Sequence, residues 1–188
     1  MSHTLPVFPW DTLVDAAATA RSHPGGIVDL SRYIHPRVEP EVCFVTRRAI
    51  DAPLTSLEAA DYLEAVAPAM EIIDSRYRDF RFTYTDVVAD NTSAAGYVIG
   101  RWLPLQNVED RSVRMEVGGE TVVGSTSAIL GDPVRALHAL LDIARRRRIP
   151  LRAGQVILAG AATAAVRLDE GVAQIGRASC RERVSSPV

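Results

Sequence analysis

The stretch that decides the fold is RVEPEVCFV, residues 37–45. The run from Val38 to Ile50 predicts a strand, in which Pro40 is expected to confine that end to a sheet edge or a bulge. Side chains alternate along a strand, so Glu39 and Glu41 share one face. Two like charges beside an apolar run are unfavourable unless water or a cation compensates them. A divalent metal ion is one compensation, and a solvated strand edge is the other interpretation.

A third carboxylate extends the metal interpretation. Ala69 to Asp74 predicts a second, buried strand, and Glu71 lies inside it, where an isolated carboxylate needs a partner. Three carboxylates suit a hard cation such as Mg²⁺ or Mn²⁺, which leaves further coordination positions to water and substrate oxygens. The spacing also permits a non-enzymatic binding or structural module in which Glu39 and Glu41 face solvent. The two interpretations differ in whether a divalent cation binds.

Two helices and an extended segment are expected outside these strands. Thr55 to Glu58 has the spacing of a capping box, and it predicts a helix that ends at Pro68. The apolar face of that helix would comprise Leu57, Ala60, Leu63, Val66, Ala67 and Met70. Thr83 to Asp90 is expected to be extended. Asp132-Pro133 predicts the start of a second helix, which ends in four arginines before Pro150.

The remaining strand signals predict an α+β fold. Gly118-Gly119 is expected to form a two-residue hairpin loop between residues 113–117 and 121–123. Gln155 to Ala159 predicts the last strong strand. Strands outnumber helices without a regular strand-helix alternation, which argues against a doubly wound sheet.

The composition is that of one soluble globular domain. The chain has 188 residues, of which 47% are hydrophobic, and its formal net charge of -2 does not predict a nucleic-acid partner. All 21 basic residues are arginines, which excludes a lysine Schiff base. Two cysteines, Cys43 and Cys180, are too few for a disulfide scaffold. No apolar run approaches the roughly 18 to 20 residues of a membrane span. We therefore expect a cytoplasmic protein without membrane partners.

Three blocks of the sequence resemble a known family. They are IHPRVEPEVCFV (residues 34–45), VAPAMEIIDSRY (66–77) and DVVADNTS (86–93). In this order and spacing they resemble the hydratase and decarboxylase branch of the fumarylacetoacetate hydrolase superfamily, over about residues 32–173. The resemblance implies a mixed, mostly antiparallel β-sheet roll like the C-terminal domain of that superfamily, truncated at both ends.

The resemblance also implies an activity on 2-oxo-enoic acids of aromatic meta-cleavage. Glu39, Glu41 and Glu71 would bind Mg²⁺ or Mn²⁺ and act in catalysis through the metal. The implied reaction is a lyase step, decarboxylation of 4-oxalocrotonate to 2-oxopent-4-enoate, with hydration of 2-oxopent-4-enoate as the alternative. The IDSRY form of the second block favours the decarboxylase. The implied partners are a small 2-oxo acid, further copies of the chain in a homo-oligomer, and a hydratase subunit.

Further side chains are assigned to the substrate by the resemblance. Arg76 would hold a distal substrate carboxylate, although an arginine after a strand end is equally typical of a surface ion pair. Asp90 and Asn91 would lie near the site, or else form an ordinary Asx turn. Gly160 and Thr163 would contact a substrate carboxylate, because glycine permits close backbone approach.

The histidines carry weaker signals. His35 is a candidate acid or base, but a His-Pro pair before a strand is more typical of a structural residue. His3, His23 and His138 have no group of chemically suitable neighbours in the sequence.

Both ends of the chain depart from the family. Residues 1–31, with a short helix expected from Trp10 to Ala20, resemble the start of a succinyldiaminopimelate-type aminotransferase, and the family's substrate-proximal lysine is missing. QIGRASCRERV, residues 174–184, resembles a translated sequencing adapter, so residues 174–188 are expected to be an artefactual, disordered tail, with a natural polar tail as the alternative. The predicted organisation is a foreign segment (1–31), a catalytic core (32–173) and that tail. An inactive truncated chimera is therefore a further alternative.

Overall fold

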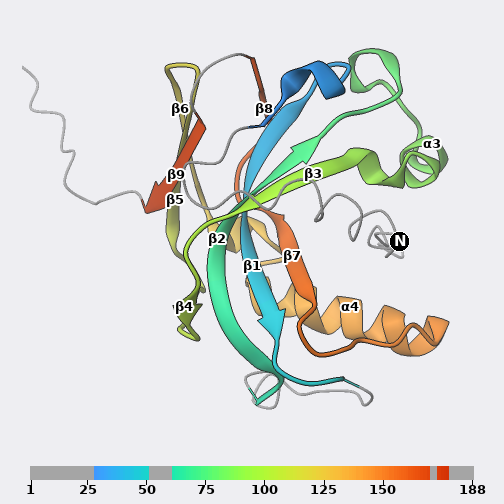
Figure 1. Cartoon of the computed structure of the whole chain (residues 1–188), viewed down its shortest axis with the longest axis vertical. Helices are drawn as coiled ribbons and strands as arrows, with labels where there is room; N and C mark the ends of the chain where they lie inside the picture. The colour runs from blue at the N-terminus through green and yellow to red at the C-terminus, as the bar shows by residue number, and fades with distance from the viewer. Residues whose placement is uncertain (1–27, 51–60, 170–172, 178–188) are drawn as a thin grey trace, which may run out of the picture.

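The computed structural model describes residues 28–50, 61–169 and 173–177, which form two β-sheets and accompanying helices (Figure 1). The larger sheet contains β1 (Arg37–Thr46), β2 (Leu63–Ile73), β3 (Ala94–Ile99), β4 (Leu103–Pro104), β7 (Val156–Ala161) and β8 (Val166–Arg167). The smaller sheet contains β5 (Ser112–Val117), β6 (Glu120–Ser125) and β9 (Ala173–Arg177). The helices are α3 (Tyr84–Ala89) and α4 (Pro133–Arg147), with short 3-10 turns η1 (Leu30–Arg32), η2 (Arg78–Phe80), η3 (Asn91–Ser93) and η4 (Thr126–Ala128).

The strand pairing confirms the expected antiparallel α+β roll. The larger sheet has the order β3-β2-β1-β7, with β4 paired to β2 and β8 paired to β1. The smaller sheet has the order β6-β5-β9. All pairs between these described strands are antiparallel.

β1 is a central strand, with β2 on one side and β7 and β8 on the other. The expectation that Pro40 confines this end to a sheet edge is therefore wrong. Pro40 lies between the residues that pair with β8 and those that pair with β7, and the register with β7 shifts between Glu41 and Cys43. The expected irregularity is present, and the missing N–H of Pro40 falls where the partner strand changes.

β2 replaces the second half of the expected first helix. Leu63, Val66, Ala67 and Met70 lie in an extended strand that pairs with β1, so the helix is wrong over these residues. The predicted start of that helix lies outside the described residues, as does the helix expected near the N-terminus. The spacing of these apolar residues was compatible with both structures, and continuous pairing with β1 decides in favour of the strand.

α3 corrects the extended segment that the sequence predicts from Thr83 to Asp90. Thr83 and Asp86 form a capping box: the Thr83 hydroxyl accepts from the Asp86 N–H, and the Asp86 carboxylate accepts from the Thr83 N–H. This reciprocal bonding satisfies two N–H groups that a helix start otherwise leaves unpaired. The local cap therefore outweighs the strand preference of Val87 and Val88.

The smaller sheet contains the predicted hairpin. Val117 lies opposite Glu120, and Gly118 and Gly119 form the two-residue loop with φ angles of 56° and 88°. β9 adds a third strand, in which Ala173–Arg177 pairs with β5. The expectation of a disordered tail is therefore wrong for residues 174–177, which pair with β5.

α4 begins and ends where the sequence predicts. The Asp132 carboxylate accepts a hydrogen bond from the Val134 N–H (2.9 Å), and Pro133 holds the first helical position. Residues 145–147 form the last turn, where their positive charges face the negative end of the helix dipole, and Arg148 ends the helix in the left-handed region. No helix in the described part of the chain is long and apolar enough to cross a membrane.

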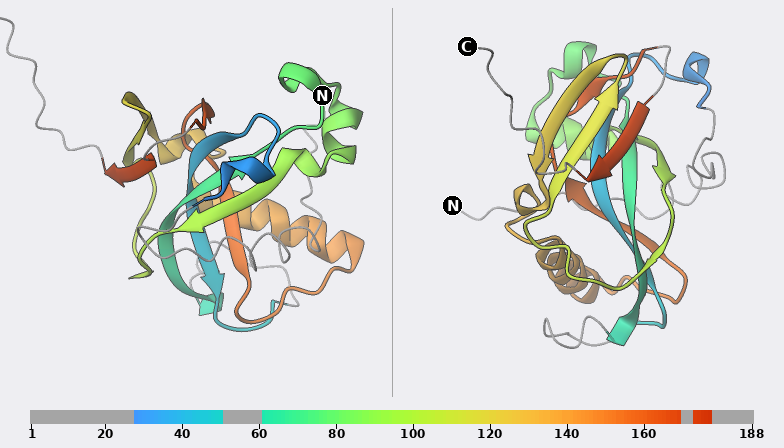
Figure 2. Two further views of the ribbon diagram at one scale, coloured as in Figure 1. Left: turned by 45° about the horizontal axis from the view of Figure 1, so that its top comes forward. Right: turned by 90° about the vertical axis from the view of Figure 1, so that its left-hand side faces the viewer.

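The main apolar core lies between α4 and one face of the larger sheet (Figure 2). It includes Leu137, Leu141, Ala144, Val42, Phe44, Val66 and Ile157. The smaller sheet packs on the same face of β1, through contacts of Met115 and Val117 with Val38. Since side chains alternate along β1, the odd-numbered residues Glu39 and Glu41 project from the opposite face.

Gly124 of β6 marks a close approach between the smaller sheet and the loop after β7. A Cβ atom at this position would collide with the Ala162 carbonyl oxygen and lie 2.7 Å from Thr163 Cγ2. We expect Gly124→Ala to lower the free energy of unfolding by about 1–3 kcal/mol, because the backbone must move to admit the methyl group. Chemical denaturation measures this loss. Val123→Ala is the control, since Val123 is 64% exposed on the same strand. An equal loss of stability in Val123→Ala would show that the close contact at Gly124 is not the cause.

Candidate metal centre

Three glutamates converge on the face of the larger sheet opposite α4. The register pairs Glu39 of β1 with Glu71 of β2, and Glu41 lies two residues further along the same face of β1. Carboxylate oxygens of the three residues lie within 4.8 Å of one another. Glu41 and Glu71 are only 3% and 4% exposed, whereas Glu39 is half-buried. The structure thus brings together the three acids that the sequence singles out.

The end of β7 fixes the orientation of Glu41. The Gly160 N–H donates a hydrogen bond to Glu41 Oε2 (2.8 Å), and Gly160 has a φ of 120°, a conformation that L-residues rarely adopt. The shift in the β1–β7 register next to Glu41 accompanies this contact. The N–H of Gly160 is thus directed at a member of the glutamate cluster, and the contact of Gly160 with a substrate carboxylate stays a prediction.

Burial raises the pKa of all three carboxyl groups. Desolvation, the charges of Glu41 and Glu39, and hydrogen bonds with both hold the pKa of Glu71 well above its usual value. Desolvation raises the pKa of Glu41 to about 7, although hydrogen bonds with Glu71 and from the Gly160 N–H lower it. Desolvation also raises the pKa of Glu39, against a lowering effect of its hydrogen bond with Glu71. Without a cation, the cluster therefore retains protons that exposed glutamates release.

The donor set fits a hard divalent cation. Carboxylate oxygens are the side-chain ligands that Mg²⁺ and Mn²⁺ prefer. Within the described residues, none of the ion pairs involves Glu39, Glu41 or Glu71, so no arginine neutralises the cluster. A bound cation would displace the shared protons and offset the repulsion among the three acids.

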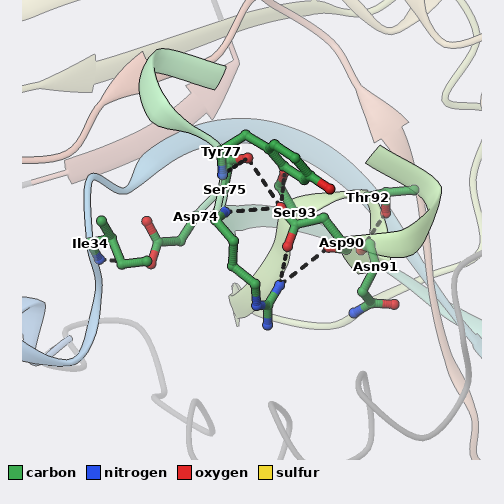
Figure 3. Close-up of polar contacts among 9 residues, drawn as sticks. Ile34, Asp74, Ser75, Tyr77, Asp90, Asn91, Thr92 and Ser93 are labelled. Atoms are coloured by element: carbon green, nitrogen blue, oxygen red, sulfur yellow. Dashed lines mark hydrogen bonds and ion pairs between the residues drawn. The ribbon is translucent and has the colours of Figure 1, made fainter. Parts of the chain in front are cut away.

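A second polar cluster surrounds the buried carboxylate of Asp90, at the end of α3 (Figure 3). Asp90 Oδ2 accepts hydrogen bonds from the Arg76 N–H (3.0 Å), the Ser75 hydroxyl (3.1 Å) and the Ser93 hydroxyl (3.3 Å). Asp90 Oδ1 pairs with the Arg76 guanidinium. Burial raises the pKa of Asp90, but these bonds outweigh it and lower the pKa overall. Arg76 thus forms an ion pair with Asp90, which the sequence suggested as the alternative to a contact with the substrate.

Asn91 follows Asp90 and is buried without hydrogen-bond partners. Neither its Nδ2 nor its Oδ1 atom has one within the described structure, and its side chain points away from the Asp90 carboxylate in Figure 3. Asn91, Thr92 and Ser93 all have positive φ angles, of 53°, 53° and 62°. Unpaired buried amides and consecutive left-handed residues are unfavourable and tend to occur at functional positions. The predicted alternative of an ordinary Asx turn does not account for the unpaired amide.

The remaining candidates from the sequence are Thr163, in the loop between β7 and β8, and the histidines. The Thr163 hydroxyl donates to the Ala164 carbonyl oxygen (3.0 Å), so it is held within its own loop. The His35 ring packs on Phe80, and its Nε2 atom is buried without a partner among the described residues. His138 lies on α4 with Nε2 likewise buried and unpartnered, and His3 and His23 lie outside the described residues.

Sequence reasoning missed several residues that support these groups. Ser75 and Ser93 hold Asp90, and Tyr97 of β3 lies opposite Glu71 in the sheet register. Serine hydroxyls in loops are common, and pairing partners become known only with the strand register. Ser75 and Ser93 lie within two of the sequence blocks that carry the resemblance, residues 66–77 and 86–93, and these blocks were the signals that pointed to this region.

Comparison with known proteins places the chain in a family. A 4-oxalocrotonate decarboxylase from Pseudomonas sp. is 51% identical over 150 residues, which cover 79% of this chain and 59% of the relative. The solved 4-oxalocrotonate decarboxylase from Pseudomonas putida G7, complexed with magnesium and adipate, superposes with a TM-score of 0.77 at 31% identity, covering 89% of this chain and 69% of that chain. The chain belongs to the decarboxylase and hydratase branch of the fumarylacetoacetate hydrolase superfamily.

The branch also includes hydratase relatives. A 2-keto-4-pentenoate hydratase from Burkholderia vietnamiensis is 36% identical over 144 residues, covering 73% of this chain and 54% of the relative. No protein-family model matches the chain. This member of the branch spans a little under three fifths of the length of the decarboxylase relatives that it matches in sequence. These relatives are named as a decarboxylase and a hydratase, which confirms the prediction that the family is enzymatic.

The glutamate cluster predicts how the stability of this branch member depends on pH. Glu41 has a folded-state pKa of about 7, above its usual value of 4.5, so its stability contribution is present at low pH and is lost as pH rises through 7. In the presence of a chelator, the free energy of unfolding should therefore fall as the pH rises from about 5 to about 8. Asp90, whose pKa is lowered, stays ionised over this range.

Denaturation curves recorded across that pH range measure the effect. Glu41→Gln is the matched variant, because the amide keeps the shape of the side chain and cannot ionise. Its pH dependence should be flatter than that of the wild type. A wild-type stability that rises from pH 5 to pH 8 would contradict the expected sign.

Proposed function

We propose that the chain is the catalytic core of a divalent-metal-dependent lyase that decarboxylates 4-oxalocrotonate. The observation that carries the proposal is the convergence of Glu39, Glu41 and Glu71 within 4.8 Å of one another. The 51% identity to a 4-oxalocrotonate decarboxylase supports this reaction over the alternatives. Structures in the superfamily that contain magnesium or manganese support the choice of Mg²⁺ or Mn²⁺.

The proposed reaction releases CO₂ from a 2-oxo-enedioate. The electron pair of the broken C–C bond passes through the conjugated chain to the 2-oxo oxygen, which takes up a proton to give the dienol of 2-oxopent-4-enoate. When bound at the three glutamates, a divalent cation supplies positive charge beside the oxygen where negative charge develops. The burial of Glu41 and Glu71 excludes water and so strengthens electrostatic interactions at this point.

The chain's own residues hold the proposed site in a fixed geometry. The Gly160 N–H orients Glu41, and Glu71 is held between its two acidic neighbours. Asn91 offers one donor and one acceptor, both without a protein partner in the described structure, and these suit the polar atoms of a 2-oxo acid. The pair of Arg76 and Asp90 would act by positioning the turn that carries Asn91. Gly160 and Thr163 remain proposed neighbours of the substrate.

A second candidate function is hydration of 2-oxopent-4-enoate. It is favoured by hydratase relatives that are 34–38% identical to this chain. Both reactions use a 2-oxo acid and the same cation, so the glutamate cluster is compatible with either. A homo-oligomer and a hydratase partner subunit belong to the proposal as well, by analogy with the family.

Parallel assays distinguish these activities. The purified chain with Mg²⁺ would be given 4-oxalocrotonate, with CO₂ release as the readout, and separately 2-oxopent-4-enoate, with loss of the dienol absorbance as the readout. CO₂ release above the buffer rate supports the proposal, and hydration alone supports the second candidate. No turnover of either substrate by a folded chain that binds Mg²⁺ would contradict both activities.

We predict that Mg²⁺ stabilises the chain against thermal unfolding. A cation that binds only the folded state adds about 2.7 kcal/mol at a hundredfold excess over its dissociation constant. Glu39→Gln and Glu71→Gln should abolish this shift and raise the melting temperature of the metal-free chain, because each removes like-charge repulsion. Glu64→Gln is the control, since Glu64 lies exposed on β2. A Mg²⁺ shift retained by Glu71→Gln would contradict the assigned site.

Asn91→Gly should separate activity from stability. Glycine tolerates the positive φ of residue 91, and the amide that it removes has no partner in the described structure. We expect a change of about 1 kcal/mol or less in the free energy of unfolding, and a turnover reduced by at least about tenfold. Denaturation curves and steady-state kinetics measure the two quantities. Unchanged turnover would remove Asn91 from the proposed site.

A further inference from the structure

Arg37 projects from the face of β1 that carries the glutamate cluster. It lies two residues before Glu39 on the same strand, and its partner Ile73 in β2 lies two residues after Glu71. Two residues along a strand span about 6.5–7 Å, with both side chains on the same face. Arg37 is therefore the first cationic residue along the sheet from the proposed metal ligands.

The guanidinium of Arg37 is held by a ring instead of by an acid. Its Cζ atom lies 4.3 Å from the centroid of the Phe80 ring. Arg37 has no ion pair among the described residues, whereas Arg76 is paired with Asp90 and the neighbouring Arg167 of β8 is paired with Asp169. Arg37 is half-buried, and its guanidinium has no counter-ion among the described residues.

A second unpaired polar group contacts the same ring. The ring of His35 lies 5.0 Å from that of Phe80, and His35 Nε2 is buried without a hydrogen-bond partner in the described structure. The backbone before β1 is fixed in place, because the Asp74 carboxylate accepts hydrogen bonds from the N–H groups of Ile34 and His35, each at 2.8 Å. Phe80 itself has a positive φ of 56°, as does Asp79 before it, at 58°.

These observations point to an anion as the missing partner. An arginine fork binds a carboxylate through two parallel hydrogen bonds, and a histidine Nε2–H can donate one more. The positive φ angles in η2 are an unfavourable conformation, and they accompany the contacts of the Phe80 ring with Arg37 and His35. His35 Nε2 has no partner and Arg37 has no counter-ion among the described residues, and both side chains contact the Phe80 ring, so a carboxylate bound at this ring would satisfy both groups.

We propose that Arg37, with His35 and the Phe80 ring, binds the second carboxylate of a dicarboxylic 2-oxo acid whose 2-oxo end lies at Glu39, Glu41 and Glu71. This inference rests on the proposed function, and it names the residues that select a dicarboxylate over a monocarboxylate. Arg76, which the sequence suggested for this task, has its guanidinium paired with Asp90. A monocarboxylic 2-oxo acid would leave Arg37 without a counter-ion, and that difference is the source of the selectivity.

Two saturated ligands test the proposal without turnover. 2-Oxoadipate and 2-oxohexanoate share the 2-oxo acid end and the chain length, and they differ in the far carboxylate. Isothermal titration of the full chain with saturating Mg²⁺ gives their dissociation constants, and titration with Mg²⁺ alone tests the metal site separately. For the wild type we expect 2-oxoadipate to bind at least about tenfold more tightly than 2-oxohexanoate.

Arg37→Met should abolish this preference and leave the binding of Mg²⁺ and of 2-oxohexanoate unchanged, because methionine keeps an unbranched contact with Phe80. Arg37→Lys should restore part of the preference, and His35→Phe should weaken it while keeping the ring contact. Arg48→Met is the matched control, since the Arg48 guanidinium lies 4.2 Å from the Tyr62 ring beyond the other end of β1.

The outcomes separate this inference from the function on which it rests. A dicarboxylate preference that survives in Arg37→Met with Mg²⁺ bound would overturn the inference and leave the metal site intact. A preference lost equally in Arg48→Met would overturn it too. A wild type that fails to bind Mg²⁺ would overturn the proposed function, and the inference with it.

Discussion

The pairing of β1 with β2 is the constraint on which the rest of the structure depends. Val42 and Phe44 of β1 are buried on the α4 side, and each fully buried side chain of this size contributes about 1.5–3 kcal/mol. A slip of one residue would turn these side chains away from α4 and turn Glu39 and Glu41 into the apolar core. Burial of the even-numbered residues thus forces the odd-numbered acids together on the opposite face. Apolar packing overcomes the repulsion that an isolated acidic cluster would experience.

Two prolines in the centre of the larger sheet show how this pairing accommodates interruptions. Pro40 in β1 lies where the partner changes from β8 to β7, and Pro68 in β2 lies between the residues that pair with β3 and with β4. In each case the missing N–H coincides with a gap between two short partner strands. The register shift beside Glu41 belongs to the same interruption, and it allows the Gly160 N–H to reach the Glu41 side chain instead of a main-chain carbonyl.

Features with a local chemical cause could be predicted from the sequence. The Gly118-Gly119 hairpin and the cap at Asp132 follow from turn and helix-end chemistry, and the glutamates of β1 follow from the period of a strand. The expected helix over Leu63–Met70 failed because the spacing of its apolar residues suits both structures, and only the pairing with β1 decides. The extended prediction at Thr83 is wrong for the opposite reason, since it rests on two valines, whereas the local capping box determines the helix.

The supporting contacts of the candidate site could not be predicted, because each joins residues that are distant in sequence. The Gly160 N–H contacts Glu41 across 119 positions, and Asp74 reaches back to the backbone of His35 across 39. The unpaired amide of Asn91 is likewise visible only when every neighbour is placed. Residue type and spacing identify the acids, whereas the groups that orient them depend on the folded arrangement of several strands.

The contact between Gly160 and Glu41 has an evolutionary consequence. The donor is a main-chain amide, which every residue except proline possesses, so a change of side chain cannot delete it by removing the donating atom. What a substitution can change is the backbone angle, since the φ of 120° excludes most side chains. Selection on the orientation of Glu41 would therefore act on residue 160 through a single dihedral angle, and not through the chemistry of a donor side chain.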